Sequence, residues 1–213
     1  MFETLLFDLD GTLTNPFEGI TNAILYALGE MGIHETDRQK LTAFIGPPLL
    51  QSFREFYGLD EDDALRATRS FRVYYERQGI YENVPYEGIS QALAALKTRA
   101  KQLFVATSKP EPFAVRILER FSLAQYFDGI AGATLDETRT EKAEVIAYAL
   151  ERFRIPKQGT LMIGDRKHDI LGAKQNGLNS LGVLYGFGSR EELLAAGADL
   201  LCETPARLPE VIS

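Results

Sequence analysis

Several features that mark extracellular, membrane or histidine-based metal proteins are missing from this sequence. Its 213 residues include one cysteine, Cys202, which cannot form an internal disulfide and fits a reducing compartment. The two histidines, His34 and His168, are too few and too far apart to suggest a metal cluster. No apolar run approaches the roughly 20 residues that a membrane span needs. We therefore expect a cytoplasmic protein with no membrane partner.

A basic region is also missing from the first residues, where Glu3 and Asp8 interrupt an apolar stretch. A secretory signal peptide begins with a positively charged segment, so we expect none here. Positive charge is scarce along the whole chain, because 23 Lys and Arg residues against 30 Asp and Glu residues give a net charge of −7. Without a basic stripe there is little to bind a phosphate backbone, which argues against a nucleic-acid polymer as partner.

The residues that are present describe a globular protein of ordinary composition. Hydrophobic residues make up 45% of the chain and charged residues 25%, which are usual values for soluble domains. The length suits one large domain, or one domain with an insertion, and is sufficient for a substantial core. Internal repeats and low-complexity segments are absent from the sequence.

The chain opens with an apolar run that ends in two aspartates and a glycine. Residues 1–7 have the composition of a buried strand, and Asp8, Asp10 and Gly11 follow. Alternate residues of a strand point the same way, so both carboxylates share one face at its carboxyl end, where open α/β sheets bind ligands. Close carboxylates repel unless a cation or a proton separates them. The pattern suggests magnesium-assisted phosphoryl transfer, although an acidic turn fits these residues equally well on its own.

Residues 15–84 have a helical character throughout. Apolar residues at helical spacing predict four helices, at 17–31, 37–46, 49–56 and 60–79. No strand is predicted between them, which is typical of a small helical bundle. We therefore expect an inserted helical domain, with its linkers near residues 14–16 and 84–85.

From residue 86 onward, predicted helices and strands alternate. Strands are predicted at 102–107, 129–131, 160–163, 180–184 and 199–202, and the longer helices between them at 112–121, 142–153 and 168–176. Alternation of this kind predicts a parallel sheet covered by helices on both faces. The fold class is therefore α/β.

Further polar residues fall at or just beyond the predicted strand ends. They are Thr107-Ser108-Lys109 after one strand, Lys142 at the start of a helix after another, and Gly164-Asp165 after a third, with Asp169 four residues on. Each is more often a turn residue, a helix cap or a solvated charge than a functional group. Several such groups at one edge of one sheet are much harder to explain in that way.

These motifs, in this order, resemble those of the haloacid dehalogenase-like hydrolase superfamily in its phosphatase branch. Asp8-Leu9-Asp10-Gly11-Thr12 is similar to its first motif, Thr107 to the second, Lys142 to the third, and the segment from Gly164 to Asp169 to the fourth. The resemblance covers almost the whole chain. It implies a Rossmann-like parallel sheet core, formed by residues 1–14 and 85–213, with an inserted α-helical cap at residues 15–84.

The resemblance also implies a role for each catalytic residue. Asp8 would attack phosphorus and form an aspartyl-phosphate, since a carboxylate is a competent nucleophile once its charge is balanced. Asp10 would protonate the leaving alcohol and then activate water. Thr107 and Lys142 would hold the oxygens of the transferring phosphoryl group, because charge stabilisation dominates such reactions.

Cofactor and substrate contacts follow from the same resemblance. Mg²⁺ would lie between Asp8, the backbone carbonyl of Asp10, and Asp165, and Asp169 would bind it through water or orient its neighbours. The side chains of Lys109 and Arg139 are candidate substrate contacts, and the Ser108 backbone amide is a further donor. Selection among substrates is expected in the cap, because the core contacts little besides phosphate.

The sequence thus predicts a magnesium-dependent phosphomonoesterase acting on a small phosphorylated metabolite, as a monomer or homodimer. Local stretches resemble 5′-nucleotidases, which is the preferred interpretation, or phosphoglycolate phosphatases. A sugar phosphatase or a phosphomutase remains an alternative. Asp10 stands where a true haloacid dehalogenase is expected to have tyrosine, which argues against carbon–halogen hydrolysis. The non-enzymatic alternatives are a phospho-accepting signalling domain and a binding domain that has lost activity.

Overall fold

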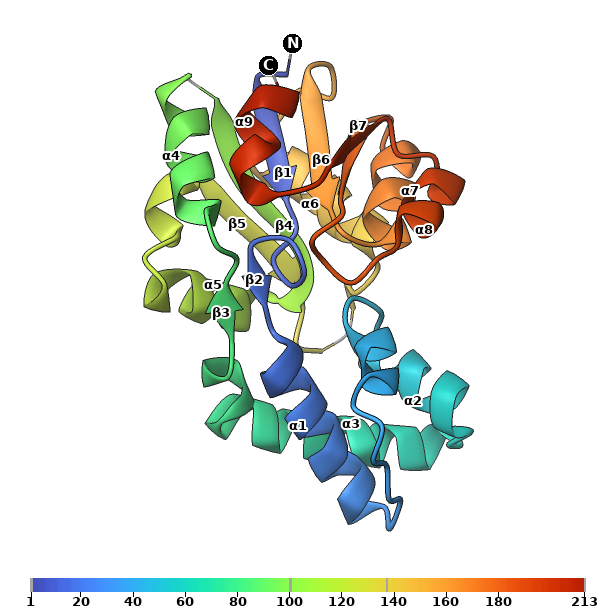
Figure 1. Ribbon diagram of the computed structural model, residues 1–213. Coiled ribbons are helices and arrows are strands. Elements are labelled where there is room, and N and C mark those ends of the chain that lie inside the picture. Colours follow the sequence, from blue (N-terminus) through green and yellow to red (C-terminus); the bar gives the residue numbers. More distant parts are fainter. Residues whose placement is uncertain (1, 100, 137, 213) are drawn as a thin grey trace. The chain divides into compact units, whose positions relative to one another are not determined.

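The chain divides into two compact units (Figure 1). The computed structural model describes residues 2–99, 101–136 and 138–212. One unit contains Met1–Asn15 and Pro85–Ser213, and the other is the inserted segment Pro16–Val84. Where the chain passes between them, the short strands β2 (Thr14–Asn15) and β3 (Val84–Pro85) pair with each other.

The first unit is built on a parallel sheet of six strands in the order β5-β4-β1-β6-β7-β8. The strands are β1 (Thr4–Phe7), β4 (Gln102–Pro110), β5 (Gly129–Ala133), β6 (Thr160–Gly164), β7 (Asn179–Val183) and β8 (Leu200–Cys202). The predicted α/β class and parallel sheet are therefore confirmed. Because β1 lies between β4 and β6, the polar residues at the carboxyl ends of these three strands meet at one edge of the sheet.

Burial on both faces explains the apolar sequence of the central strands. In β1, Leu5, Leu6 and Phe7 are fully buried, as expected for a parallel strand covered on both sides. Leu6 packs in a core cluster with Val145 and Ile146 of α6 (Lys142–Arg152). Figure 1 shows α6 behind the sheet and α9 (Leu208–Val211) in front of it.

Helices connect successive strands of the first unit. Besides α6, the connecting helices are α4 (Ile89–Thr98), α5 (Glu111–Arg120), α7 (Lys167–Gln175) and α8 (Arg190–Ala196), with a 3₁₀ turn at Ala124–Tyr126. A 3₁₀ turn at Pro205–Arg207 and α9 follow the last strand. Strand β4 runs three residues past its predicted end at Thr107. It does so because Pro110 pairs with Ala133 of β5 after an irregularity in the register, which draws Ser108 and Lys109 into the edge of the sheet.

The inserted unit is helical, as the periodicity predicts. It contains α1 (Phe17–Glu30), α2 (Leu49–Tyr57) and α3 (Glu61–Arg77), with 3₁₀ segments at Lys40–Phe44 and Gly79–Tyr81. Asp60 caps α3 by accepting a hydrogen bond from the Asp63 backbone N–H at 2.9 Å, which satisfies an otherwise unpaired donor. A Cβ atom on Gly19 of α1 would lie 2.1 Å from the Gly79 carbonyl oxygen, so only glycine permits this approach.

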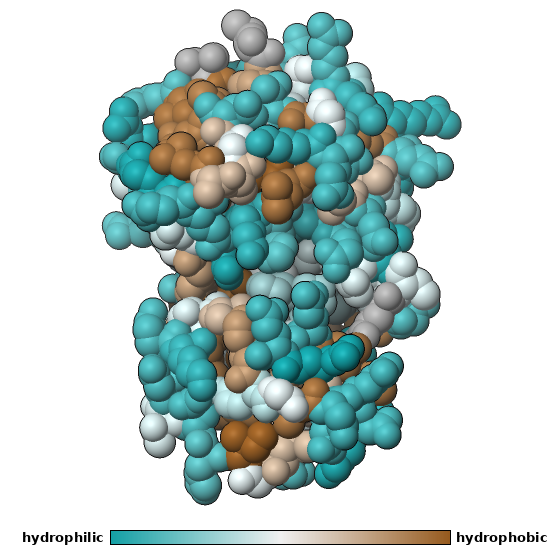
Figure 2. Space-filling model, turned by 90° about the vertical axis from the view of Figure 1, so that its right-hand side faces the viewer, coloured by the Kyte–Doolittle hydropathy of each residue, from teal (hydrophilic) through white to brown (hydrophobic). Residues whose placement is uncertain are grey.

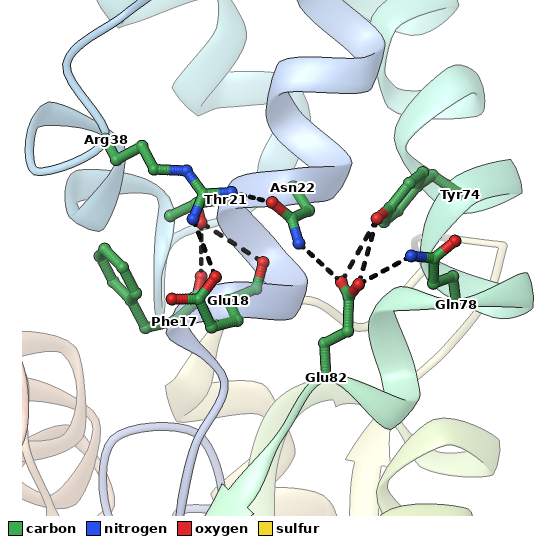
Figure 3. A network of polar contacts seen from close by, with 8 residues as sticks. All are labelled: Phe17, Glu18, Thr21, Asn22, Arg38, Tyr74, Gln78 and Glu82. Carbon is green, nitrogen blue, oxygen red and sulfur yellow. Dashed lines mark hydrogen bonds and ion pairs between the residues drawn. The ribbon is translucent and has the colours of Figure 1, made fainter.

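A polar network ties α1 to α3 inside the inserted unit (Figure 3). The Glu82 carboxylate accepts hydrogen bonds from Asn22 at 3.0 Å, from Gln78 at 2.9 Å and from the Tyr74 hydroxyl at 3.2 Å. Arg38 extends the network by donating to Asn22 and pairing with Glu18. Glu82 therefore joins α1 to the C-terminal part of α3 through the side chains of three residues.

The surface is mixed in character. Figure 2 shows hydrophilic residues over most of the visible face, with small hydrophobic groups between them. Large exposed apolar side chains, such as Tyr81, Val84 and Leu194, occur on both units. Among the described residues, no helix has the length and apolar character needed to span a bilayer.

Candidate active site

A tight loop after β1 positions the first two candidate residues. The Asp8 backbone N–H donates to the Ile163 carbonyl of β6 at 2.9 Å, and the Leu9 N–H donates to Asp8 Oδ1 at 2.8 Å. Gly11 follows with φ of +83°, a left-handed conformation that favours glycine. A Cβ atom there would lie 2.2 Å from Asp165 Oδ2, so the close packing also requires glycine.

Lys142 is the central cation of the site. As the first residue of α6, it places Nζ 2.8 Å from Asp8 Oδ1, 2.8 Å from Asp169 Oδ1 and 3.2 Å from the Ala106 carbonyl oxygen. These three acceptors match the three hydrogens of an ammonium group. Burial alone would lower the pKa of Lys142, but the charges of Asp169 and Asp8 outweigh it and raise the pKa above its ordinary value. The side chain is therefore held in its charged form.

Asp8, Asp165 and Asp169 form an acidic cluster, in which one oxygen of each carboxylate lies within 4.8 Å of the others. Asp165 Oδ2 accepts a hydrogen bond from the Phe187 N–H at 2.8 Å, whereas Asp165 Oδ1 is buried and finds no hydrogen-bond partner among the described residues. Burial raises the pKa of Asp165 well above its usual range, and the charges of Asp169 and Asp8 raise it further. The cluster therefore has too little positive charge for its three carboxylates, because Lys142 contacts only Asp8 and Asp169.

A divalent cation fits this cluster on chemical grounds. The donors are buried carboxylate oxygens, which are the ligands that Mg²⁺ prefers, and Asp165 presents an oxygen that would otherwise stay unsatisfied. Burial also raises the pKa of Asp169 to about 6, against the opposing effect of Lys142. A bound cation would remove the cost of ionising these groups together.

Asp10 is held apart from the acidic cluster by a different lysine. Lys109 Nζ forms an ion pair with Asp10 Oδ2, and the two side chains are only 6% and 12% exposed. The other oxygen, Oδ1, is buried and has no hydrogen-bond partner within the described part of the chain. Burial raises the pKa of Asp10, although the Lys109 ammonium opposes that shift. The two aspartates of the opening motif therefore pair with different lysines.

Thr107 lies on the same strand end as Lys109. Its side chain is buried, and its Oγ1 accepts a hydrogen bond from the Lys109 backbone N–H at 3.2 Å. The hydroxyl hydrogen is thereby left to donate to another group. Ser108 lies between them and is partly buried.

Comparisons with known proteins identify the family of the chain. Residues 5–183 match the family described as haloacid dehalogenase-like hydrolase. The chain belongs to that family. More specifically, it is a phosphatase, as the names of similar proteins indicate.

Two relatives and one solved structure illustrate the range of proteins that are similar to this chain. A 5′-nucleotidase of Pseudomonas aeruginosa is 46% identical over 99% of this chain and 96% of its own. A tyrosine-protein kinase, PtkA, of Mycobacterium tuberculosis is 39% identical over 87% of this chain and 63% of its own. The crystal structure of a predicted phosphatase from Clostridium acetobutylicum is 45% identical, covers 99% of this chain and 97% of its own, and superposes with a TM-score of 0.96.

Arg139 lies outside the group formed by the acidic cluster, Asp10 and the two lysines. Its Nε and Nη2 donate to the Gly132 carbonyl oxygen at 3.1 and 3.0 Å, and its guanidinium stacks 3.6 Å over the Tyr148 ring. It lines a separate pocket of about 390 Å³ with Glu111 and Asp136. In the described residues no contact joins Arg139 to the acidic cluster. Its predicted role as a substrate contact stays a prediction.

One loop of the site was not predicted from the sequence. Gly186, Phe187 and Gly188 follow β7 and enclose Asp165. A Cβ atom on Gly186 would lie 2.3 Å from Asp165 Cβ, and one on Gly188 would lie 1.9 Å from the Asp165 carbonyl oxygen. The available signal is a glycine pair directly after a predicted strand, because glycine marks close approach of another backbone.

Two tyrosines near the site were also missed. The Tyr185 hydroxyl donates to the Thr12 carbonyl at 3.1 Å, and the Tyr86 ring packs edge-on against Tyr185 with centroids 5.0 Å apart. Burial raises the pKa of Tyr86, and the charges of Asp165 and Asp10 add to that effect. Sequence spacing could not identify this pair, because 99 residues separate its members.

Proposed function

We propose that this phosphatase is a magnesium-dependent 5′-nucleotidase that works through an aspartyl-phosphate on Asp8. The observation that carries the proposal is the position of Asp8, which directly follows β1, belongs to the acidic cluster and lies 2.8 Å from Lys142. A carboxylate so placed is balanced by a cation and can act as a nucleophile. The nucleotide specificity rests on likeness to a relative named 5′-nucleotidase.

The reaction would proceed in two displacements. A carboxylate oxygen of Asp8 forms a bond to phosphorus while the bond from phosphorus to the leaving oxygen breaks, and Asp10 gives its proton to that oxygen. Water then attacks the phosphorus, Asp10 takes a proton from the water, and the bond from phosphorus to Asp8 breaks. Phosphate leaves, and Asp8 and Asp10 return to their starting forms.

The remaining residues would stabilise the phosphoryl group and hold the cofactor. Thr107 donates its hydroxyl hydrogen to a phosphoryl oxygen, and Lys142 keeps a positive charge beside Asp8 throughout. Mg²⁺ would be held by Asp8, Asp165, Asp169 and the backbone carbonyl of Asp10, where it supplies positive charge to offset the phosphoryl oxygens. Substrate choice by the inserted unit, the cytoplasmic location and a monomeric or homodimeric state remain predictions.

Phosphate release from a panel of substrates tests the proposal. The panel contains nucleoside 5′-monophosphates, phosphoglycolate and sugar phosphates, each with and without Mg²⁺. We expect Mg²⁺-dependent turnover that is fastest with a nucleoside 5′-monophosphate and is lost in Asp8→Asn. Thermal unfolding of the variant checks that it is folded.

Other outcomes of the substrate panel would reject a specific part of the proposal. Fastest turnover of phosphoglycolate or of a sugar phosphate would reject the nucleotidase proposal while keeping the mechanism. Full activity in Asp8→Asn would reject the nucleophile. If the phosphoryl group moved to another position of the substrate and no free phosphate was released, the protein would be a mutase.

A further inference from the structure

The carboxylates of the site are divided between two lysines. Lys142 contacts Asp8 and Asp169, whereas Lys109 pairs with Asp10. The lysines reach the site from different elements, since Lys109 lies near the end of β4 and Lys142 begins α6. The proposed mechanism uses Lys142 and gives Lys109 no role.

We propose that Lys109 is a positioning residue, which holds the Asp10 side chain where it exchanges a proton with the leaving oxygen and then with water. This inference rests on the proposed function, because it requires Asp10 to act as the acid and base. Direct contact between Lys109 and the substrate stays a separate prediction.

The orientation of Asp10 supports this assignment. Lys109 binds Oδ2, while Oδ1 is buried and has no hydrogen-bond partner in the described ranges. An anchored carboxylate with one free oxygen is suited to proton transfer, because transfer needs a defined heavy-atom distance and direction. Without the anchor, the side chain is free to turn toward other groups, at the cost of that geometry.

The backbone of Lys109 strengthens the argument. Its N–H donates to Thr107 Oγ1 at 3.2 Å, so one residue fixes the hydroxyl proposed to bind the phosphoryl group and also the proton-transfer carboxylate. The irregular register of β4 between Thr107 and Pro110 brings both contacts to the same strand end. The Lys109 side chain is also 6% exposed, so its ion pair is screened little by solvent.

The chemistry gives Lys109 a signature that a merely structural role lacks. In the first displacement the bond to the leaving oxygen breaks and the Asp10 proton goes to that oxygen, while Lys109 neither gains nor loses a proton. An alkoxide is a poor leaving group and needs that proton, whereas 4-nitrophenolate departs readily without it. A misplaced Asp10 should therefore slow alkyl phosphates selectively.

The test compares kcat/KM for glycerol phosphate and 4-nitrophenyl phosphate in the intact protein. This parameter covers the steps up to departure of the leaving group, and the ratio for two substrates does not depend on how much of the variant is folded. In Lys109→Met, we expect the ratio of the alkyl to the aryl value to fall by about tenfold or more. Lys109→Arg keeps the positive charge, so it should restore most of the ratio.

A parallel loss for both substrates, or no loss for either, overturns the proposal. Asp10→Asn separates this failure from failure of the proposed mechanism. If Asp10→Asn lowers the ratio and Lys109→Met does not, the role of Lys109 is wrong while that of Asp10 stands. If Asp10→Asn lowers both values equally, proton transfer by Asp10 is wrong and the role of Lys109 is overturned with it.

Discussion

The Glu35 carboxylate of the inserted unit and the acidic cluster of the sheet unit have opposite surroundings. Glu35 of the inserted unit accepts hydrogen bonds from the backbone N–H of Asp37, from Lys40 and from Tyr57, which lower its pKa to about 2. In the acidic cluster, burial instead raises the pKa of Asp165 and Asp169. Hydrogen-bond donors are therefore plentiful around Glu35 and too few around the acidic cluster.

This difference separates structural carboxylates from functional ones. A carboxylate with enough donors stabilises the fold as it is, and its ionised form is the preferred one. Carboxylates crowded together with too few donors cost stability, and they suit a ligand that brings positive charge. The contrast is open to experiment, because each group can be altered without touching the other.

Removal of Lys142 should have the largest effect. Lys142→Met leaves Asp8 and Asp169 buried without their shared cation, which we expect to cost about 3–5 kcal/mol of unfolding free energy. Activity should fall by about 10²-fold or more, because phosphoryl charge loses a stabilising group. Denaturant unfolding in metal-free buffer at pH 7 measures the first effect, and Lys157→Met on the surface is the control. Equal stability of the two variants would show that the site is not short of positive charge.

The stability of the metal-free protein should depend on pH in the sense opposite to that produced by a carboxylate whose pKa is lowered on folding. Burial raises the pKa of Asp169 from 3.8 to about 6, so between these values the folded state binds more protons than the unfolded state. The free energy of unfolding therefore falls as pH rises through this window, by about 3 kcal/mol from Asp169 alone. Because Mg²⁺ favours the ionised form, the rise in Tm that it produces should be larger at pH 8 than at pH 5. An equal rise at both pH values would contradict this.

The sequence was sufficient to place three candidate residues near the carboxyl ends of strands. Asp8, Thr107 and Asp165 come directly after apolar runs, and parallel strands bring such residues to one edge. Alternation of helix and strand likewise predicted the sheet. These features depend on local composition and on a general rule of topology, which is why a single chain reveals them.

The partners of these residues could not be predicted in the same way. That Lys109 pairs with Asp10 depends on the direction of a long side chain at an irregular strand end. Arg139 lies three residues before Lys142 in the sequence, yet its guanidinium bonds to Gly132 and stacks on Tyr148. Sequence proximity places a backbone near a site, and only packing decides where the side chain goes.

Neutralising one member of the acidic cluster should stabilise the metal-free protein while it abolishes function. In Asp165→Asn the amide oxygen can still accept the Phe187 N–H, but repulsion from Asp169 and Asp8 is gone. We expect a gain of about 1–2 kcal/mol in unfolding free energy at pH 7. Mg²⁺-dependent activity should be lost, together with the rise in Tm on adding Mg²⁺. Glu119→Gln, an exposed change of the same kind, controls for net charge; a loss of stability in Asp165→Asn alone would reject the argument.

The matching change in the inserted unit should have the opposite sign and the smallest size. Glu82→Gln keeps the shape of the side chain but removes the charge that accepts hydrogen bonds from Asn22, Tyr74 and Gln78 (Figure 3). Hydrogen bonds to a charged acceptor are stronger than those to a neutral one, so we expect a loss of about 1 kcal/mol. Glu76→Gln, on the exposed side of α3, should change stability much less, and Mg²⁺ should raise the Tm of both variants as much as that of the parent. If Glu82→Gln instead stabilised the protein, as Asp165→Asn is expected to do, the two groups of carboxylates would not differ in kind, and donor supply would not distinguish a binding site from a structural network.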